Sequence, residues 1–435
     1  MSSTSSDAPE ELRPPITETT FVATASGEDD PPTPIKGVRR LLWWILPSNF
    51  AIFLIWGAVP GVLLPEQVRV ALGDEGKLAN MVIISTIGAF VAMIAQPVAG
   101  QISDRTRSRF GRRAPWIVLG ALAGALSLVG LAFANSLVGF IIAWSLVQIT
   151  FNFAQGPLSA VLPDRVPIAR RGTFATLSGI GLMIGALGGS VLGALFFHSI
   201  AVGYIVFAVF AVLVLLGFVL ANPDHPSTNF ASEPFSFVEF LKTFWVNPVK
   251  NPDFFWAFTG RLLLYTGYFG VIGYQLYILT DYLQVKQPET VIPLLGLISL
   301  AGVIIATAVS GPLSDRVGRR KPFVFGSSVV MGLALILPWV WPTLTSWMIM
   351  TFVIGLGFGM FQAVDTALMS QVLPSAKNFA KDLGVVNIAA TLPQTLAPAV
   401  GGAIALSLGY WALFPIGIVL SILGAVCVWF IKATK

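Results

Sequence analysis

Apolar runs of about 20 residues recur along nearly the whole chain, separated by short polar loops. A run of that length crosses the hydrocarbon core of a bilayer as a helix. The runs are continuous rather than alternating, which excludes a transmembrane β-barrel. Only 11% of the residues are charged, whereas soluble domains carry roughly 25%. These features predict an integral membrane protein.

The apolar runs predict twelve transmembrane helices and place them along the chain. The predicted spans cover residues 41–64, 80–99, 116–134, 136–161, 174–197, 201–221, 254–280, 291–310, 323–341, 344–372, 384–408 and 410–431. Helix ends predicted in this way can each slip by about three residues.

A short motif occurs twice at a spacing close to half the chain. GQISDR at Gly100–Arg105 and GPLSDR at Gly311–Arg316 each open a basic loop between two apolar runs, 211 residues apart. VLP at Val161–Pro163 returns at Val372–Pro374 with the same spacing. Two landmarks at one spacing indicate a duplicated unit. We therefore predict six-helix bundles at 38–221 and 254–435.

The segments outside the bundles have a different composition. Residues 1–37 are rich in Ser, Thr, Pro and acidic residues, which predicts a disordered cytoplasmic tail. They lack the basic start and apolar stretch of a signal peptide. Residues 222–253 form a linker between the bundles, and its aromatic stretch 235–245 predicts a short helix lying on the membrane surface.

Positive charge is distributed unequally between the two sides of the membrane. All but four of the 26 Lys and Arg residues fall in the tails and loops of one side; the exceptions are Arg69, Lys77, Lys286 and Arg261. Loops rich in positive charge stay in the cytoplasm. We therefore expect a multi-pass protein of the cell membrane with both termini cytoplasmic. The net charge of +5 then sets topology and does not indicate a nucleic-acid partner.

The basic loops carry a resemblance to a known family. QPVAGQISDRTRSRFGRRAP at Gln96–Pro115 resembles the loop signature of the major facilitator superfamily. Its extended form is similar to the glycoside–pentoside–hexuronide cation symporters and the sucrose–proton symporters, as are LPDR at Leu162–Arg165 and KDLGVVN at Lys381–Asn387. The resemblance implies an all-α membrane protein of the major facilitator fold. Its two pseudo-symmetric six-helix bundles would rock around a central site.

The doubled loop motif suggests a gate. Asp104 and Asp315 can accept hydrogen bonds from a helix start, or pair with an arginine such as Arg165 across the bundle. Clustered arginines can also bridge the two bundles, although arginines that only fix topology would look the same. The predicted gating residues are Asp104, Arg105, Arg112, Arg113, Arg165, Asp315, Arg316, Arg319 and Arg320.

Two ionisable residues lie clearly inside predicted spans, where charge is costly and points to function. Arg261 and Asp365 each lie about seven residues from the same side, so both are roughly 10 Å deep. Equal depth allows them to pair. Asp365 is then either a proton site that releases Arg261 or one member of a permanent structural pair.

Other polar residues form stripes on single helix faces. Amides, phenols and an indole suit a neutral polyhydroxyl ligand, although intramembrane amides also hold helices together. The predicted substrate-binding residues are Trp144, Gln148, Asn152, Gln155, Tyr265, Tyr268, Gln275, Gln362, Asn387, Thr391 and Gln394. Gly181, Gly185, Gly189 and Gly193 form a further stripe, which predicts close helix packing or, alternatively, a sliding surface between the bundles.

These residues predict a monomeric secondary transporter that moves a sugar or glycoside-like solute with a proton. The alternatives are a proton-driven exporter of drugs or metabolites and, from another class, a membrane sensor or enzyme. An enzyme would need a grouped nucleophile, base or metal set. No such group is visible in the sequence: Cys427 is the single cysteine, and His198 and His225 lack neighbouring ligands. We expect no cofactor and no metal.

Overall fold

The computed structural model describes residues 35–228, 248–371 and 379–432 of the 435-residue chain. Within these ranges all regular secondary structure is helical. The predicted tail up to residue 34 and the predicted surface helix in 235–245 lie outside the described residues.

Six long helical segments make up the first half of the chain. They are α1 (Ile35–Ala58) continued by η1 (Val59–Leu63) and α2 (Leu64–Leu72), α3 (Lys77–Arg105), α4 (Ala114–Ala132), α5 (Leu137–Arg165), α6 (Ile168–Leu195) and α7 (Ile200–Ala221). Local sequence sets several of their ends. Gly73 adopts φ 87° and ends α2, a conformation that glycine adopts without steric cost. The Ser136 side chain caps α5 by accepting from the Gly139 amide.

The second half repeats this order of helices. It comprises α9 (Pro252–Ile272), α10 (Gln275–Tyr277) and η2 (Ile278–Tyr282), α11 (Pro288–Val317), α12 (Lys321–Ala334) and α13 (Ile336–Val340), α14 (Leu344–Gln371), α15 (Phe379–Leu408), η4 (Tyr410–Ala412) and α16 (Leu413–Trp429). Pro252 and Pro288 stand at the first positions of α9 and α11, where a proline costs no hydrogen bond.

The prediction of many membrane spans is confirmed, although the count of twelve is not reached. Ten described helices are long and apolar enough to cross a bilayer, and the bent pair Pro252–Ile272 and Gln275–Tyr282, which turns by 47°, makes eleven. The remaining predicted span, 384–408, falls within α15, which has 30 residues. In the described part of α15, only Ala399–Leu408 forms an apolar stretch.

The two halves share one packing pattern. In the first half α1 packs on α6 and α7, α5 on α3 and α4, and α4 on α7; in the second half α9 packs on α15 and α16, α14 on α11 and α12, and α12 on α16. Each contact in one set has its counterpart in the other. Between the halves, α3 packs on α15 and α6 on α11, which is again one contact repeated. The sequence duplication is therefore also a structural one.

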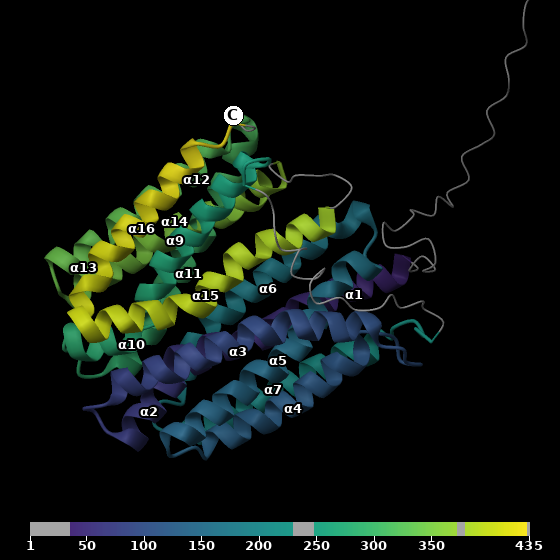
Figure 1. Cartoon of the computed structure of the whole chain (residues 1–435), viewed down its shortest axis with the longest axis horizontal. Coiled ribbons are helices and arrows are strands. Elements are labelled where there is room, and N and C mark those ends of the chain that lie inside the picture. Colours follow the sequence, from purple (N-terminus) through teal and green to yellow (C-terminus); the bar gives the residue numbers. More distant parts are fainter. Residues whose placement is uncertain (1–34, 229–247, 372–378, 433–435) are drawn as a thin grey trace, which may run out of the picture.

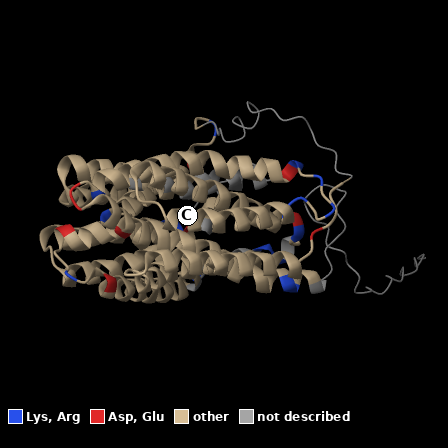
Figure 2. Ribbon diagram, turned by 90° about the horizontal axis from the view of Figure 1, so that it is seen from below, with Lys and Arg blue, Asp and Glu red and all other residues tan. Residues whose placement is uncertain are grey.

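The helices run between two charged ends. In Figure 1, α12 and α16 of the second half diverge from α4 and α7 of the first half. The two halves come together toward the side of the picture where α2 and α10 lie. Figure 2 shows Lys, Arg, Asp and Glu gathered mainly at the two ends of the helices. We call the end with loops 106–113 and 318–320 the basic end, and the end with loop 73–76 and α10 the opposite end.

The glycine stripe of α6 faces α1 within the first half. A Cβ at Gly185 would lie 2.7 Å from the Phe50 carbonyl oxygen, and one at Gly193 would lie 3.1 Å from Ala58 Cα. Gly181 and Gly189 face α1 backbone in the same way. Close helix packing is therefore confirmed for this stripe. The alternative of a sliding surface between the bundles is wrong, because α1 and α6 belong to the same half.

Candidate functional site

A buried ion pair joins α9 and α14. Arg261 Nε lies 3.3 Å from Asp365 Oδ2, and the two side chains are 9% and 4% exposed. The predicted pairing is thus present. These two atoms are buried without a hydrogen bond among the described residues, because the ion pair brings the charges together without hydrogen-bond alignment. A charge pair held in this way is attracted electrostatically but is not fixed in geometry.

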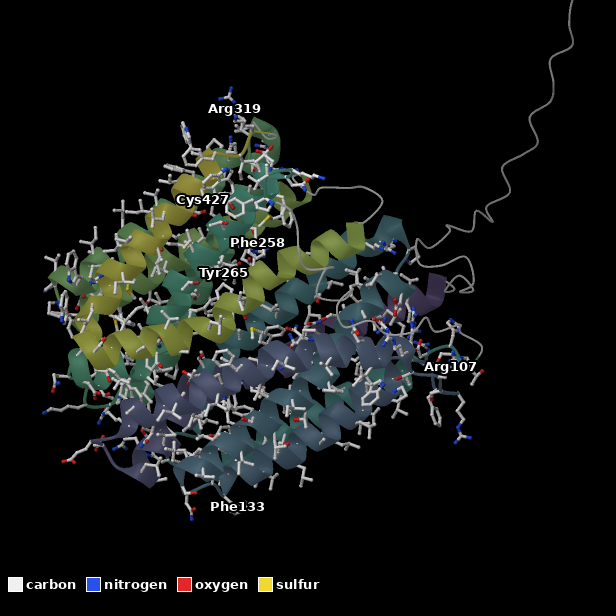
Figure 3. The ribbon with its side chains drawn as sticks, in the orientation of Figure 1. Arg107, Phe133, Phe258, Tyr265, Arg319 and Cys427 are labelled. Carbon is white, nitrogen blue, oxygen red and sulfur yellow. The ribbon has the colours of Figure 1, made fainter. Side chains whose placement is uncertain are left out.

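An aromatic and amide group lies one helical turn from this pair. Tyr265 Oη donates to Gln362 Oε1 at 2.6 Å, and the Arg261 guanidinium carbon lies 5.6 Å from the Tyr265 ring centre. The rings of Tyr265 and Tyr268 both stack on Phe358. Figure 3 shows Tyr265 inside the helices, away from both ends. Two predicted polar stripes, on α9 and α14, are therefore brought together.

The first half joins the equivalent helices through another polar contact. Trp56 Nε1 on α1 donates to Gln155 Oε1 on α5 at 2.9 Å. The Trp56 ring packs edge-on against Trp144 with centres 6.1 Å apart. Trp56 was not predicted, because it lies in an apolar run with no polar stripe around it. Its indole N–H, which seeks a partner when buried, is the signal that could have identified it.

The remaining predicted substrate residues do not gather at one place in the described structure. Asn152 is buried, and its amide nitrogen donates at 2.7 Å to the Gln148 carbonyl of the same helix. Gln275 lies beyond the bend that ends α9, and Gln394 is exposed on α15. The side chains of Asn387 and Thr391 lie outside the described residues. The described polar contacts thus lie mainly between α1 and α5 and between α9 and α14, two helix pairs that correspond under the internal repeat.

At the basic end, Arg112 and Arg113 converge on the carboxylate of Asp164 in the last turn of α5. Arg113 Nε donates to Asp164 Oδ2 at 2.7 Å, Arg112 Nη2 lies 3.0 Å from Asp164 Oδ1, and Arg113 also contacts Asp104. Burial lowers the pKa of Arg113, but Asp164 and Asp104 outweigh it and hold that pKa above its ordinary value. Arg113 therefore stays charged and fixes the loop to α5.

The prediction that Asp104 can pair with an arginine is confirmed, but Arg165, the arginine named for it, has other partners. The described partner of Asp104 is Arg113, neither Arg165 nor a helix start. Arg165 instead donates to the carbonyl oxygens of Asn222 and Pro223, both at 3.0 Å, and lies 4.0 Å from Asp224. These contacts join parts of the first half. The reason is that residues 222–228 fold back over the loop, a return that no helix pattern predicts.

Asp224 is a second residue that the sequence analysis missed. Its Oδ2 accepts from the Arg113 backbone amide at 3.2 Å, and Gly111 in the same loop adopts φ 85°. Asp164 and Asp224 each directly follow a proline at the end of a span, which is the signal that could have drawn attention to them. In the second half, Arg316 and Arg319 are exposed and Arg320 is half-buried, while the Asp315 side chain lies outside the described residues.

We expect Asp164→Asn to impair transport more than Asp104→Asn. The Asp164 side chain is 11% exposed and serves two arginines, whereas that of Asp104 is 56% exposed. Loss of one partner of a buried pair costs about 3–5 kcal/mol, whereas an exposed pair contributes roughly 1 kcal/mol or less. The measurement is the initial uptake rate per correctly inserted molecule. Equal rates in the two variants would contradict this order.

Comparison with known proteins agrees with this architecture. The family described as MFS/sugar transport protein matches the chain over residues 76–435. The sucrose transport protein SUC4 of Arabidopsis thaliana is 24% identical over 204 residues, which cover 42% of this chain and 39% of that protein. The match therefore spans less than half the length of that relative.

Two solved structures share the fold. A point mutant of the nucleoside transporter NupG superposes with a TM-score of 0.70 at 16% identity, over 90% of this chain and 99% of that chain. A bacterial homologue of the human lysosomal transporter Spinster, inward-facing and unoccupied, gives a TM-score of 0.60 at 14% identity, over 91% and 94%. The matched family consists of transporters of small solutes, not enzymes. The chain is a multi-pass membrane protein and belongs to the MFS/sugar transport protein family of the major facilitator superfamily.

Proposed function

We propose that the chain is a proton-coupled symporter of a sugar or glycoside-like solute that works by alternating access as a monomer. The observation that carries this proposal is the buried Arg261–Asp365 pair beside Tyr265 and Gln362. An ionised Asp365 attracts Arg261, whereas a protonated Asp365 does not. Protonation of Asp365 would therefore weaken the contact between α9 and α14, one helical turn from Tyr265 and Gln362.

The chemistry of the neighbouring side chains supports a neutral polyhydroxyl solute. Gln155 and Gln362 carry amides, while Trp56 and Tyr265 add aromatic faces and polar hydrogens. Amides hydrogen-bond sugar hydroxyls, and aromatic rings pack against the C–H faces of a sugar ring. The likeness to a sucrose transport protein supports the sugar class. NupG is a nucleoside transporter, and a nucleoside also carries a neutral polyhydroxyl ring.

The charge asymmetry supports an orientation. α3 runs from Lys77 at the opposite end to Arg105 at the basic end. The loops with few basic residues and the loops with many therefore lie at different ends of the same helices. We assign the basic end to the cytoplasm and the opposite end to the exterior of the cell membrane. Both chain termini then lie in the cytoplasm.

Counterflow in proteoliposomes tests the substrate class. Vesicles preloaded with one unlabelled mono- or disaccharide at high concentration are exposed to a trace of the same labelled sugar. We expect transient accumulation of label for at least one sugar or glycoside and none in vesicles without protein. If no sugar or nucleoside exchanges while proton-driven efflux of an apolar compound is observed, the exporter alternative replaces this proposal.

A further inference from the structure

One ion pair with both side chains partly buried crosses from the first half to the second at the opposite end. Lys77, the first residue of α3, places its Nζ 2.7 Å from Asp281 Oδ1 in η2, and the side chains are 12% and 28% exposed. The same Nζ lies 5.4 Å from the centre of the Tyr277 ring. Tyr277 Oη in turn donates to the Pro65 carbonyl oxygen at 3.0 Å. These contacts hold the two halves together beside the α3–α15 interface.

Each charge of this pair also has a partner within its own half. Lys77 Nζ lies 3.3 Å from Asp74 Oδ1 in the preceding loop. Asp281 Oδ2 accepts from Tyr410 Oη at 3.0 Å, and Asp281 Oδ1 accepts from the Thr280 hydroxyl at 2.8 Å. If the halves separated here, Lys77 would keep Asp74, and Asp281 would keep two hydroxyl donors. Neither charge would be left buried and unpaired, which is the costly outcome.

The other end of the molecule is arranged differently. Figure 3 shows Arg107 and Arg319, from the two basic loops, at separate corners of the molecule. The ion pairs of Arg112 and Arg113 with Asp164, and of Arg113 with Asp104, lie within the first half. At the opposite end a second polar contact also crosses the halves, from His198 to Glu289 at 3.9 Å. The His198 side chain is 82% exposed, so that contact is weak.

We propose that Lys77 and Asp281 form a latch that holds the opposite end shut, with Asp74 keeping Lys77 paired when that end opens. A gate of an alternating carrier must be strong enough to favour one state and cheap enough to release. This arrangement meets both needs, because opening breaks the pair with Asp281 while Lys77 keeps its second carboxylate, Asp74 at 3.3 Å. The latch acts on the balance of conformations and does not depend on which solute or coupling ion is carried.

The latch is tested by removing each carboxylate of Lys77 in turn. Spin labels are attached at Glu75→Cys and Gln287→Cys, both exposed positions on facing loops of the two halves, in a Cys427→Ser background in lipid nanodiscs. Electron–electron double resonance then measures the distance distribution between the labels. We expect Asp281→Asn to move the ratio of long to short distances by roughly fivefold or more toward the long ones. Asp74→Asn, the matched control, should give no increase in long distances.

A second pair of variants separates the latch from a folding defect. Lys77→Gln should lengthen the distances as Asp281→Asn does, and the exchange Lys77→Asp with Asp281→Lys should restore the short ones. The proposal is overturned if Asp74→Asn opens this end as much as Asp281→Asn does, or if neither Asp281→Asn nor Lys77→Gln changes the distribution. Because no transport is measured, failure of the latch and failure of the proposed symport give separate results.

Discussion

Asp365→Asn is expected to abolish proton-driven accumulation of the solute while counterflow continues. Asparagine has nearly the same size as aspartate but cannot take up and release a proton. A carrier with a fixed neutral group at this position can exchange solute across the membrane, yet it cannot draw energy from a proton gradient. The measurements are uptake driven by an imposed pH gradient and counterflow of the same solute, both in proteoliposomes.

The double variant Arg261→Gln with Asp365→Asn separates coupling from structural pairing. The single variant leaves the buried Arg261 without its carboxylate, which costs about 3–5 kcal/mol and lowers the yield of folded protein. The double variant removes both charges and should recover folded protein and counterflow, but not accumulation. Accumulation that persists in the double variant, with unchanged dependence on the pH gradient, would show that the pair is only structural.

Gly185→Leu is expected to prevent normal folding of the carrier. A Cβ at position 185 would already lie 2.7 Å from the Phe50 carbonyl oxygen and 3.1 Å from Phe50 Cα, which are backbone atoms of α1. Neither atom can move aside without separating α1 from α6. Overpacking typically costs about 1–3 kcal/mol, with higher values where backbone must shift. We expect a large loss of monodisperse protein and a melting temperature lower by several degrees.

Gly179→Leu is the matched control on the same helix. A Cβ at Gly179 would meet nothing within 4 Å, and replacing an exposed helical glycine generally stabilises a helix. Its yield and melting temperature should match those of the parent protein. Gly185→Leu protein that is as abundant and as stable as the control would mean that α1 and α6 do not pack as closely as described.

The membrane helices were predictable because a bilayer imposes a fixed length and an apolar composition on each span. The predicted span at 201–221 corresponds to α7 at Ile200–Ala221, and that at 344–372 begins where α14 begins. Within the predicted span 254–280 the structure bends by 47° between Ile272 and Gln275. Hydropathy cannot detect such a bend, because it measures composition and not the direction of the chain.

Part of the candidate site was predictable for the same reason. Depth in a span is counted along the chain, so Arg261 and Asp365 could be placed at one level and expected to meet. Rotation of a helix about its axis is not fixed by depth, and Trp56 therefore remained hidden in an apolar run until α1 was seen to pack beside Gln155. For the same reason a predicted polar residue can face outward: Gln394 is exposed on α15.

The sequence by itself determined the helical membrane fold, its internal duplication, the family and the equal depth of the buried charges. These follow from periodicity and from the cost of polar groups in lipid, both of which are local properties of the chain. Only the tertiary structure decided the partners of the charges at the helix ends and in the loops. Arg113 meets Asp164, Arg165 meets the chain after α7, and Lys77 meets Asp281 in the other half. Each such contact depends on the path of a loop or on the packing of the two halves against each other. Attraction between charges determines neither the loop path nor that packing.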